Sequence, residues 1–190
     1  MASGYLAPLA IATADGPTLT AASAATCLPV TAKLTFPPNS IQVGSVFRIT
    51  AHGRISCVVT TPGTARFDIR LGSTVVFDSG PMNLNTTAQT TVPWRLVINL
   101  TCRASGSSGN FIGFSDFTTV AVVGSPSVTT GGNGEFISSV SGGPGSAPAV
   151  GGNVDLTASN TFDMFFTQTV ATGSMTVHAF LLESAGLALM

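Results

Sequence analysis

Apolar and polar residues alternate along much of this chain, and the clearest alternation runs from Phe47 to Val59. Every second residue there is apolar or small, while residues such as Arg48 and Arg54 occupy positions between them. A period of two places successive side chains on opposite faces of a β-strand. The pattern therefore predicts a long strand with one buried face, and Gly53 in its middle favours a bend or a bulge.

A turn and a second alternating segment follow this strand. Pro62 presets its own φ and Gly63 tolerates a positive φ, so residues 61–64 predict a turn. Residues 65–71 then alternate strictly between apolar and polar positions. Together the two alternating segments predict an antiparallel hairpin.

Shorter strands separated by turn residues continue to the end of the chain. They are predicted over residues 33–36, 74–78, 92–102, 111–123, 135–139, 161–170 and 175–182. Many short strands spaced by turns are typical of a sandwich or a barrel. We therefore predict an all-β fold, an antiparallel two-sheet β-sandwich that is jelly-roll-like. An immunoglobulin-type sandwich is the alternative, although Cys57, Trp94 and Cys102 do not match its Cys…Trp…Cys order and spacing.

The first 28 residues have no sustained period and contain Pro8 and Pro17. We therefore predict an extended N-terminal arm over residues 1–28 and the β-sandwich over residues 29–190, with a disordered tail as the alternative for the arm. Apolar residues in the arm favour docking on a neighbouring subunit, and the apolar C-terminus is a second candidate contact element. The predicted interface residues are Tyr5, Leu6, Leu9, Ile11, Leu19, Leu187 and Leu189.

Charged residues are scarce: 8% of the chain is Asp, Glu, Lys or Arg, 44% is hydrophobic, and the formal net charge is −1. Little charge keeps such molecules apart, so we expect copies of the chain or a partner to cover much of the surface. The alternative is a monomer kept soluble by Thr, Ser and Asn. Near-neutrality argues against nucleic-acid binding. No apolar run approaches the ~20 residues that span a bilayer, and no export signal is evident.

Few residues are available for metal or redox chemistry. Cys27, Cys57 and Cys102 are an odd set without metal-site spacing, and we interpret them as buried thiols of a protein assembled in a reducing cytosol. One disulfide plus a free thiol is the alternative. His52 and His178 have no acidic residue at a spacing that suggests a metal site. We therefore predict neither a metal nor a cofactor.

Catalysis is not predicted either. The segment Gly113–Phe117 partly resembles a nucleophile elbow, but Phe117 stands where the last glycine is required. Asp68 falls between Arg66 and Arg70 on an outward face, which favours cross-strand ion pairs over a catalytic role. We therefore predict that the protein is not an enzyme and has no catalytic residue.

Four stretches of the sequence carry a resemblance to known proteins. They are Gly53–Phe77, Leu84–Thr90, the strand end Leu100–Arg103, and Val177–Glu183. Together they resemble bacteriophage and prophage virion proteins built from jelly-roll-like β-domains, and the likeness covers roughly residues 30–184. The resemblance implies an architecture and a place in a virion, and it transfers no functional residue.

The resemblance, the low charge and the arm together suggest a capsid decoration, or cement, protein. Such a protein would be a homotrimer that binds the phage major capsid protein, or another virion protein, at junctions between capsid subunits. It would be assembled in the host cytoplasm and would lie on the capsid surface of the virion. The alternative is a phage tail or fibre domain that binds a host receptor or glycan through the loops at 105–110 and 141–153.

Overall fold

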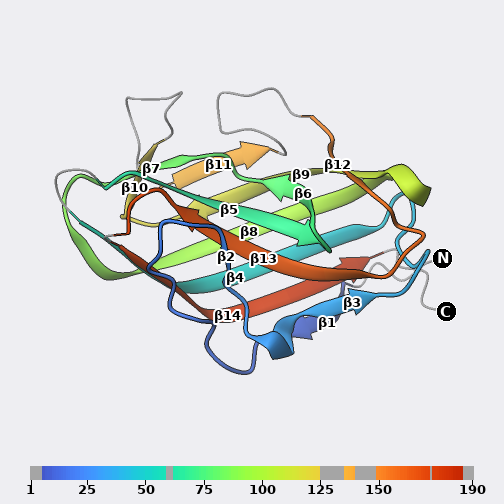
Figure 1. The fold of residues 1–190 in the computed structure, drawn as a ribbon, viewed down its shortest axis with the longest axis horizontal. Helices are drawn as coiled ribbons and strands as arrows, with labels where there is room; N and C mark the ends of the chain where they lie inside the picture. Colours follow the sequence, from blue (N-terminus) through green and yellow to red (C-terminus); the bar gives the residue numbers. More distant parts are fainter. Residues whose placement is uncertain (1–5, 59–61, 125–134, 140–148, 172, 186–190) are drawn as a thin grey trace.

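The described residues form a β-sandwich of two seven-stranded sheets (Figure 1). In the computed structural model these residues are 6–58, 62–124, 135–139, 149–171 and 173–185, with 135–139 given as a backbone strand only. Every strand pairing among them is antiparallel. The all-β fold and the two-sheet antiparallel sandwich are therefore confirmed, while the jelly-roll connectivity stays a prediction.

The first sheet, sheet A, is built on three long strands. Its strands in spatial order are β1 (Ala7–Ile11), β14 (Ser174–Ala185), β4 (Val46–Cys57), β8 (Gln89–Ala104), β9 (Gly109–Thr118) and β11 (Glu135–Ser139), with β12 (Gly151–Val154) also paired to β9. The alternation that predicted β4 matches its burial, because Phe47, Ile49 and Ala51 face the core and Arg48 faces outward. The irregularity predicted at Gly53 occurs in the partner strand, where β14 has a register shift between Val177 and Ala179.

The second sheet, sheet B, is built around β5 and β13. Its strands in order are β10 (Val122–Gly124), β7 (Met82–Leu84), β5 (Thr64–Leu71), β13 (Asn160–Gln168) and β2 (Ala25–Thr26); β3 (Leu34–Phe36) pairs with β13, and β6 (Thr74–Asp78) pairs with β5. Two short 3-10 turns, η1 (Val30–Ala32) and η2 (Gly106–Ser108), are the helical elements of the described residues. No helix among those residues has the length and apolar character needed to cross a membrane.

The predicted hairpin between β4 and β5 is wrong. These two strands belong to different sheets, because β4 is already paired along both of its edges, with β14 and with β8. The chain at Pro62 and Gly63 instead leads into sheet B, where the amide of Thr64 donates a hydrogen bond to Thr169 Oγ1 at 2.8 Å. Gly63 has a φ of 72°, and a Cβ there would lie 2.3 Å from that hydroxyl, so the turn requires glycine.

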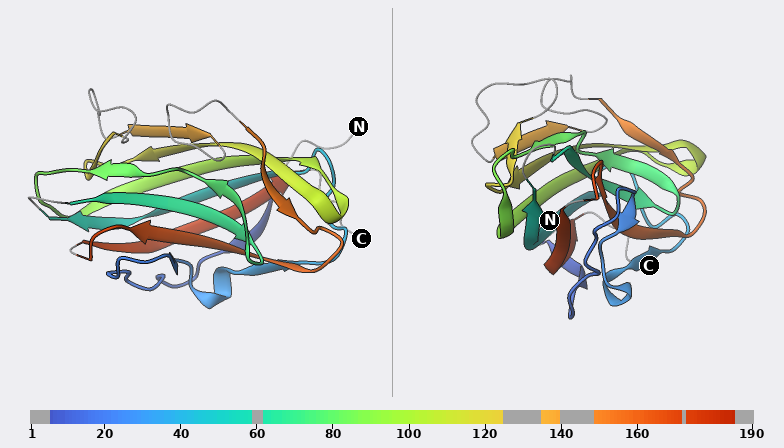
Figure 2. Two further views of the ribbon diagram at one scale, coloured as in Figure 1. Left: turned by 45° about the horizontal axis from the view of Figure 1, so that its top comes forward. Right: turned by 60° about the vertical axis from the view of Figure 1, so that its left-hand side comes forward.

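The N-terminal segment is integrated into the sandwich. Strand β1 pairs with β14, and the backbone then continues along the same edge to Leu19, whose amide donates to the Met175 carbonyl at 2.8 Å. The chain next reaches sheet B, where β2 pairs with β13 and Cys27 is fully buried. Figure 2 shows this segment, in blue, running along one side of the molecule beside β13 and β14. Residues 7–28 therefore join the edges of both sheets, and the division into an extended arm over residues 1–28 and a sandwich over residues 29–190 stays a prediction.

Aromatic rings hold the two sheets together. Phe67 of β5 has no exposed surface, and its ring centroid lies 5.4 Å from Trp94, 5.1 Å from Phe117 and 5.2 Å from Phe166. Trp94 and Phe117 belong to sheet A, and Phe166 belongs to sheet B. Tilted ring pairs at such distances add to the stabilisation that burial alone provides.

A single Phe67→Ala substitution should therefore lower the free energy of unfolding by about 3–5 kcal/mol, because it removes a ring that contacts both sheets. Urea unfolding followed by circular dichroism measures this change. Phe114→Ala is the matched control, since the Phe114 ring is 49% exposed on the outer face of sheet A, and it should cost about 0.5 kcal/mol or less. Equal losses in the two variants would contradict the central position of Phe67.

Candidate interaction surface

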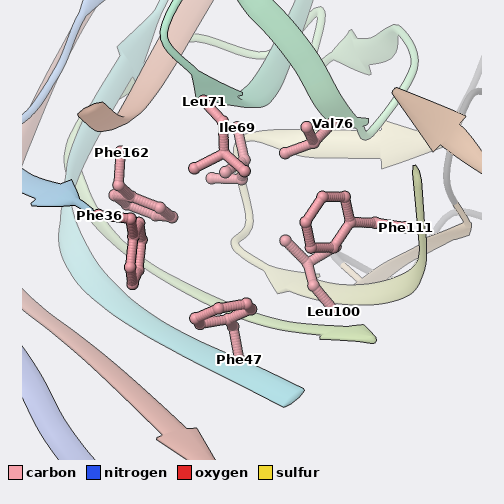
Figure 3. A pocket seen from close by; sticks show the side chains of 8 residues that line it. All are labelled: Phe36, Phe47, Ile69, Leu71, Val76, Leu100, Phe111 and Phe162. Carbon is pink, nitrogen blue, oxygen red and sulfur yellow. The ribbon is translucent and has the colours of Figure 1, made fainter. Parts of the chain in front are cut away.

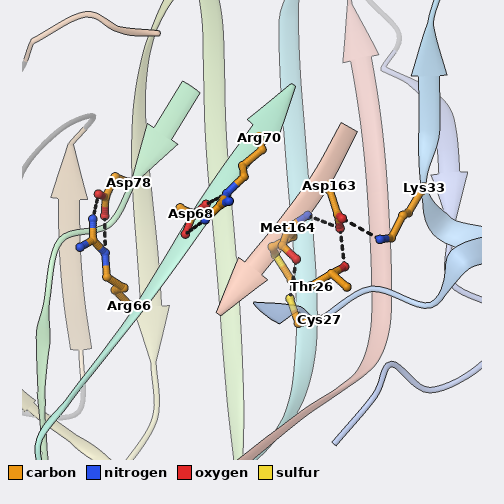
Figure 4. A network of polar contacts seen from close by, with 9 residues as sticks. All are labelled: Thr26, Cys27, Lys33, Arg66, Asp68, Arg70, Asp78, Asp163 and Met164. Carbon is orange, nitrogen blue, oxygen red and sulfur yellow. Dashed lines mark hydrogen bonds and ion pairs between the residues drawn. The ribbon is translucent and has the colours of Figure 1, made fainter. Parts of the chain in front are cut away.

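The outer face of sheet B carries a network of paired charges (Figure 4). Lys33 Nζ donates to Asp163 Oδ2 at 2.6 Å, and the same carboxylate accepts a hydrogen bond from Thr26 Oγ1 at 2.7 Å. Asp163 lies on β13, so these contacts fasten the N-terminal segment to the outer face of the sheet.

The remaining cations of this face are paired on β5. Arg70 Nε donates to Asp68 Oδ1 at 2.5 Å, and its guanidinium lies 3.8 Å from the centroid of the Phe165 ring. The hydrogen bond to Asp68 raises the pKa of Arg70 above its already high usual value. Arg66 pairs across the strands with Asp78 of β6. The predicted ion pairs are therefore present, although Asp68 pairs with Arg70 within β5 and the cross-strand pair joins Arg66 to Asp78.

The outer face of sheet A carries four arginines, which differ from those of sheet B in their pairing with acids. Arg48 and Arg54 lie on β4, Arg95 and Arg103 lie on β8, and all four side chains are exposed. None of these guanidinium groups forms an ion pair with any residue in the part of the chain that the structure describes. The two outer faces thus differ within the described residues: the cations of sheet B are paired with acids, and those of sheet A are not.

A groove opens at one end of the arginine-bearing face. Its volume is about 480 Å³, and its described lining residues are His52, Val92, Pro93, Trp94, Arg95, Thr118, Thr119 and Val120. Two basic side chains meet here because His52 and Arg95 are directly opposite in the β4–β8 register. Arg54 lies two residues beyond His52 on the same face of β4. We use the term arginine groove for the lining residues His52, Arg95, Val92, Pro93 and Val120 together with Arg54, which is not in the lining but lies beside it on β4.

Trp94 forms part of this groove from below and is only 3% exposed. Its Nε1 atom is buried and has no hydrogen-bond partner among the residues that the structure describes. Gly53, opposite Trp94 in the register, leaves room for the ring, because a Cβ at that position would lie 2.8 Å from the indole and 1.9 Å from the Thr176 carbonyl. The ring is therefore held between β4 and the core, where it packs against Phe67 and Phe117.

A small void lies between the two sheets in the interior (Figure 3). It has a volume of about 10 Å³ and is lined only by apolar side chains. The lining residues are Phe36, Phe47, Ile69, Leu71, Val76, Leu100, Phe111 and Phe162. A cavity of this size could hold a water molecule at most, and apolar walls offer water no hydrogen bonds. The void is therefore a packing defect and not a ligand pocket.

The candidate residues for metal and nucleophilic chemistry do not assemble into a site in the described part of the chain. No group of three His, Cys, Asp or Glu residues in the described ranges could hold a metal ion. His178 Nδ1 contacts Asp15 Oδ1 at 2.9 Å on the surface, and His178 lies in the register shift of β14 next to Ala179, the partner of His52. Ser115, the residue of the partial elbow motif, is buried in the middle of β9, which continues as a strand. Its position offers no strand-to-helix turn.

The predicted interface residues fall into three groups. Leu9 and Leu19 are partly buried and pack against the core, and Leu6 is partly exposed. Ile11 is 54% exposed at the end of β1. Tyr5, Leu187 and Leu189 lie outside the described residues. The structure therefore gives Leu9 and Leu19 an internal role, and contact between this segment and a neighbouring subunit stays a prediction.

The arginine face was missed in the sequence, although a signal was present. Alternation alone places Arg48 and Arg54 outward on one strand and Arg95 and Arg103 outward on another. What was missing was the β4–β8 register, which brings these residues onto one face. The loop expected at 105–110 contains η2, and the one expected at 141–153 overlaps β12, with residues 141–148 outside the described ranges.

Comparisons with known proteins add little. No family model and no curated protein matches the sequence. Among solved structures, the chain is similar to the CBM2 module of the evolved Dit of Lactobacillus casei BL23 phage J-1, at 12% identity and a TM-score of 0.30, with 80% of this chain and 67% of that chain covered. A TM-score this low supports no inference about fold or function.

Loss of the charge on Asp163 should destabilise the fold. Asp163→Asn leaves Lys33 beside a neutral amide and weakens the link to the N-terminal segment, so we expect the free energy of unfolding to fall by about 1–3 kcal/mol. Urea unfolding at neutral pH measures the loss. Asp116→Asn is the control, because Asp116 is exposed and has only a weak hydrogen bond from Thr118 at 3.4 Å. If Asp116→Asn lowered the free energy of unfolding as much as Asp163→Asn does, the contacts of Asp163 would contribute no more to stability than those of an exposed carboxylate.

Because of the three free thiols, we expect the stability of the fold to decrease at alkaline pH. Burial raises the pKa of Cys27 well above its usual value, and it also raises the pKa of Cys57 and Cys102. The unfolded chain therefore loses these protons above about pH 8.5 while the folded chain keeps them, so stability falls as pH rises. For Cys27 alone the expected loss between pH 8.5 and 9.5 is about 1 kcal/mol.

Urea unfolding of the wild type and of Cys27→Ala across this pH range measures the effect. The variant should lose less stability than the wild type between the two pH values, whatever its stability at pH 7. Parallel pH profiles for the two proteins would show that the Cys27 thiol titrates normally in the folded state.

Proposed function

We propose that this protein is a non-enzymatic structural component of a bacteriophage particle, a decoration protein that binds at junctions between major capsid subunits as a trimer. The observation that carries the proposal is the poverty of free charge on its exterior. The chain has 15 charged residues, 7 basic and 8 acidic. Six of them neutralise one another on the outer face of sheet B. Burial against other subunits removes the penalty of such a surface.

Exposed apolar side chains support the same proposal. Large hydrophobic residues are exposed on several elements of the sandwich. They are Ile11, Val30, Val43, Val75, Phe114, Val120, Val123 and Val150. They are spread over the molecule and do not line one cleft, which suits a protein that contacts several neighbours. The resemblance of residues 30–184 to phage virion proteins supports the virion as the place of these contacts.

A tail or fibre domain that binds a host receptor is the second candidate. The groove on the outer face of sheet A favours it, because receptor-binding modules present concave sites on rigid sheets. The two functions differ in copy number. A decoration protein is present in numbers comparable to the major capsid protein, whereas a tail protein is a small fraction of it.

Gel densitometry of purified particles tests the proposal, combined with particles assembled without this chain. We expect a band comparable in molar amount to that of the major capsid protein. We also expect particles without the chain to release their DNA at a lower temperature, and purified protein added back should restore the wild-type temperature. A small molar fraction would favour the tail, and absence from particles would refute both candidates.

A further inference from the structure

The arginines of sheet A are the least explained feature of the structure. Of the seven basic residues, three are paired with acids on sheet B. The other four lie on one face of sheet A and form no ion pair among the side chains that the structure describes, although Arg48 is opposite Glu183 in the β4–β14 register. Basic side chains that face one another across strands destabilise a sheet unless an anion lies between them. A protein with so few charges therefore concentrates its unneutralised cations where a partner could supply the anions.

Basic side chains lie closest together at the end of this face where the groove opens. His52 and Arg95 occupy opposing positions, where Cβ atoms lie about 5 Å apart, and Arg54 is a diagonal neighbour of Arg95 at about 7–8 Å. The groove beside them has apolar walls formed by Val92, Pro93 and Val120. Guanidinium groups next to an apolar recess can bind a carboxylate bidentately while an adjacent apolar side chain is buried.

Nearby acids are few. Asp116 lies one row away, opposite Val97, and accepts a hydrogen bond from the Thr118 hydroxyl at 3.4 Å. Glu135 is opposite Thr118 in the backbone register of β11. Asp116 is not in an ion pair with Arg54 or Arg95 in the described part of the chain. The cations of the groove are thus left for an external ligand.

We propose that the arginine groove is a docking site for an acidic segment of a neighbouring virion protein, with carboxylates bound by Arg54 and Arg95 and an apolar side chain placed against Pro93 and Val120. The identity of the partner as a virion protein rests on the proposed function. The acidic and apolar character of the bound segment rests on the groove alone.

A protein segment fits the groove better than other anions do. Nucleic acid requires a longer basic stripe, and here Asp116 flanks the cations in a chain whose net charge is −1. A glycan would need an exposed aromatic ring or a dense set of hydrogen-bonding side chains. The ring that lines this groove, Trp94, is only 3% exposed.

The test compares charge reversals at the groove with one outside it. Arg54→Glu, Arg95→Glu and the double variant repel a carboxylate at the site. Arg103→Glu is the matched control, because it lies on the same strand and face as Arg95 but eight residues away, or about 27 Å. Circular dichroism and urea unfolding check that all four proteins fold like the wild type.

Two binding assays are made on each full-length protein. The first is cosedimentation with phage particles that were assembled without this chain. The second titrates poly-L-glutamate, with a single-stranded DNA oligonucleotide as the comparison, and follows the fluorescence of Trp94, the sole tryptophan of the chain. We expect the double variant to bind particles at least about 30-fold more weakly, and Arg103→Glu to stay within about threefold of the wild type. The fluorescence response to poly-L-glutamate should weaken in the same order and with added salt.

Each outcome decides between the proposals. If the wild type binds particles and the double variant binds equally well, the docking site is wrong and the virion function stands. If the wild type does not bind particles, the virion function fails, while a glutamate response that depends on Arg54 and Arg95 would still support the acidic-segment site. A response to the oligonucleotide that exceeds the response to poly-L-glutamate would overturn the choice of a protein ligand.

Discussion

The packing of two sheets around the ring of Phe67 is the interaction on which the rest of the structure depends. This ring lies between Trp94 and Phe117 of one sheet and Phe166 of the other, so the distance and angle between the sheets are set at that point. Once the sheets face each other, β14 and β13 lie along one open side. The N-terminal segment covers that side by pairing with both strands. Covered edges direct interaction with other molecules toward the outer faces.

The strands of this fold could be read from the sequence, and their partners could not. Alternation located β4, β8 and β13 because each has one buried face, and that signal is local. Which strands pair depends on which strand edges other strands already occupy. The turn at Pro62 and Gly63 was consistent with a hairpin, but β14 and β8 occupy both edges of β4. Strand β1 has little alternation of its own, and its place depends on β14 at the other end of the sequence.

The difference between local patterns and long-range pairing also explains how much of the charged surface could be predicted. Outward-facing arginines on β4 and β8 follow from alternation, but their meeting at His52 and Arg95 depends on a register that no local pattern contains. The pairing of Lys33 with Asp163 joins residues from opposite ends of the chain, so a count of charges could not show which were already neutralised. Composition indicated a surface poor in ions. Only the fold distinguishes the face whose ions are satisfied internally from the face whose ions are not.

The difference between the two faces affects how a decoration protein could bind a capsid in one orientation. If its surface were uniformly apolar and uncharged, association would have little orientation, because apolar burial is non-directional. Charges add orientation, since like charges repel wrong partners and opposite charges fix the register of the right one. Internal pairing on sheet B removes that face from the competition for anions. Under the proposed function, the arginine face of sheet A would give the sandwich one preferred side for binding, while the exposed valines, which are spread over both sheets and the loops, would add contact area without orientation.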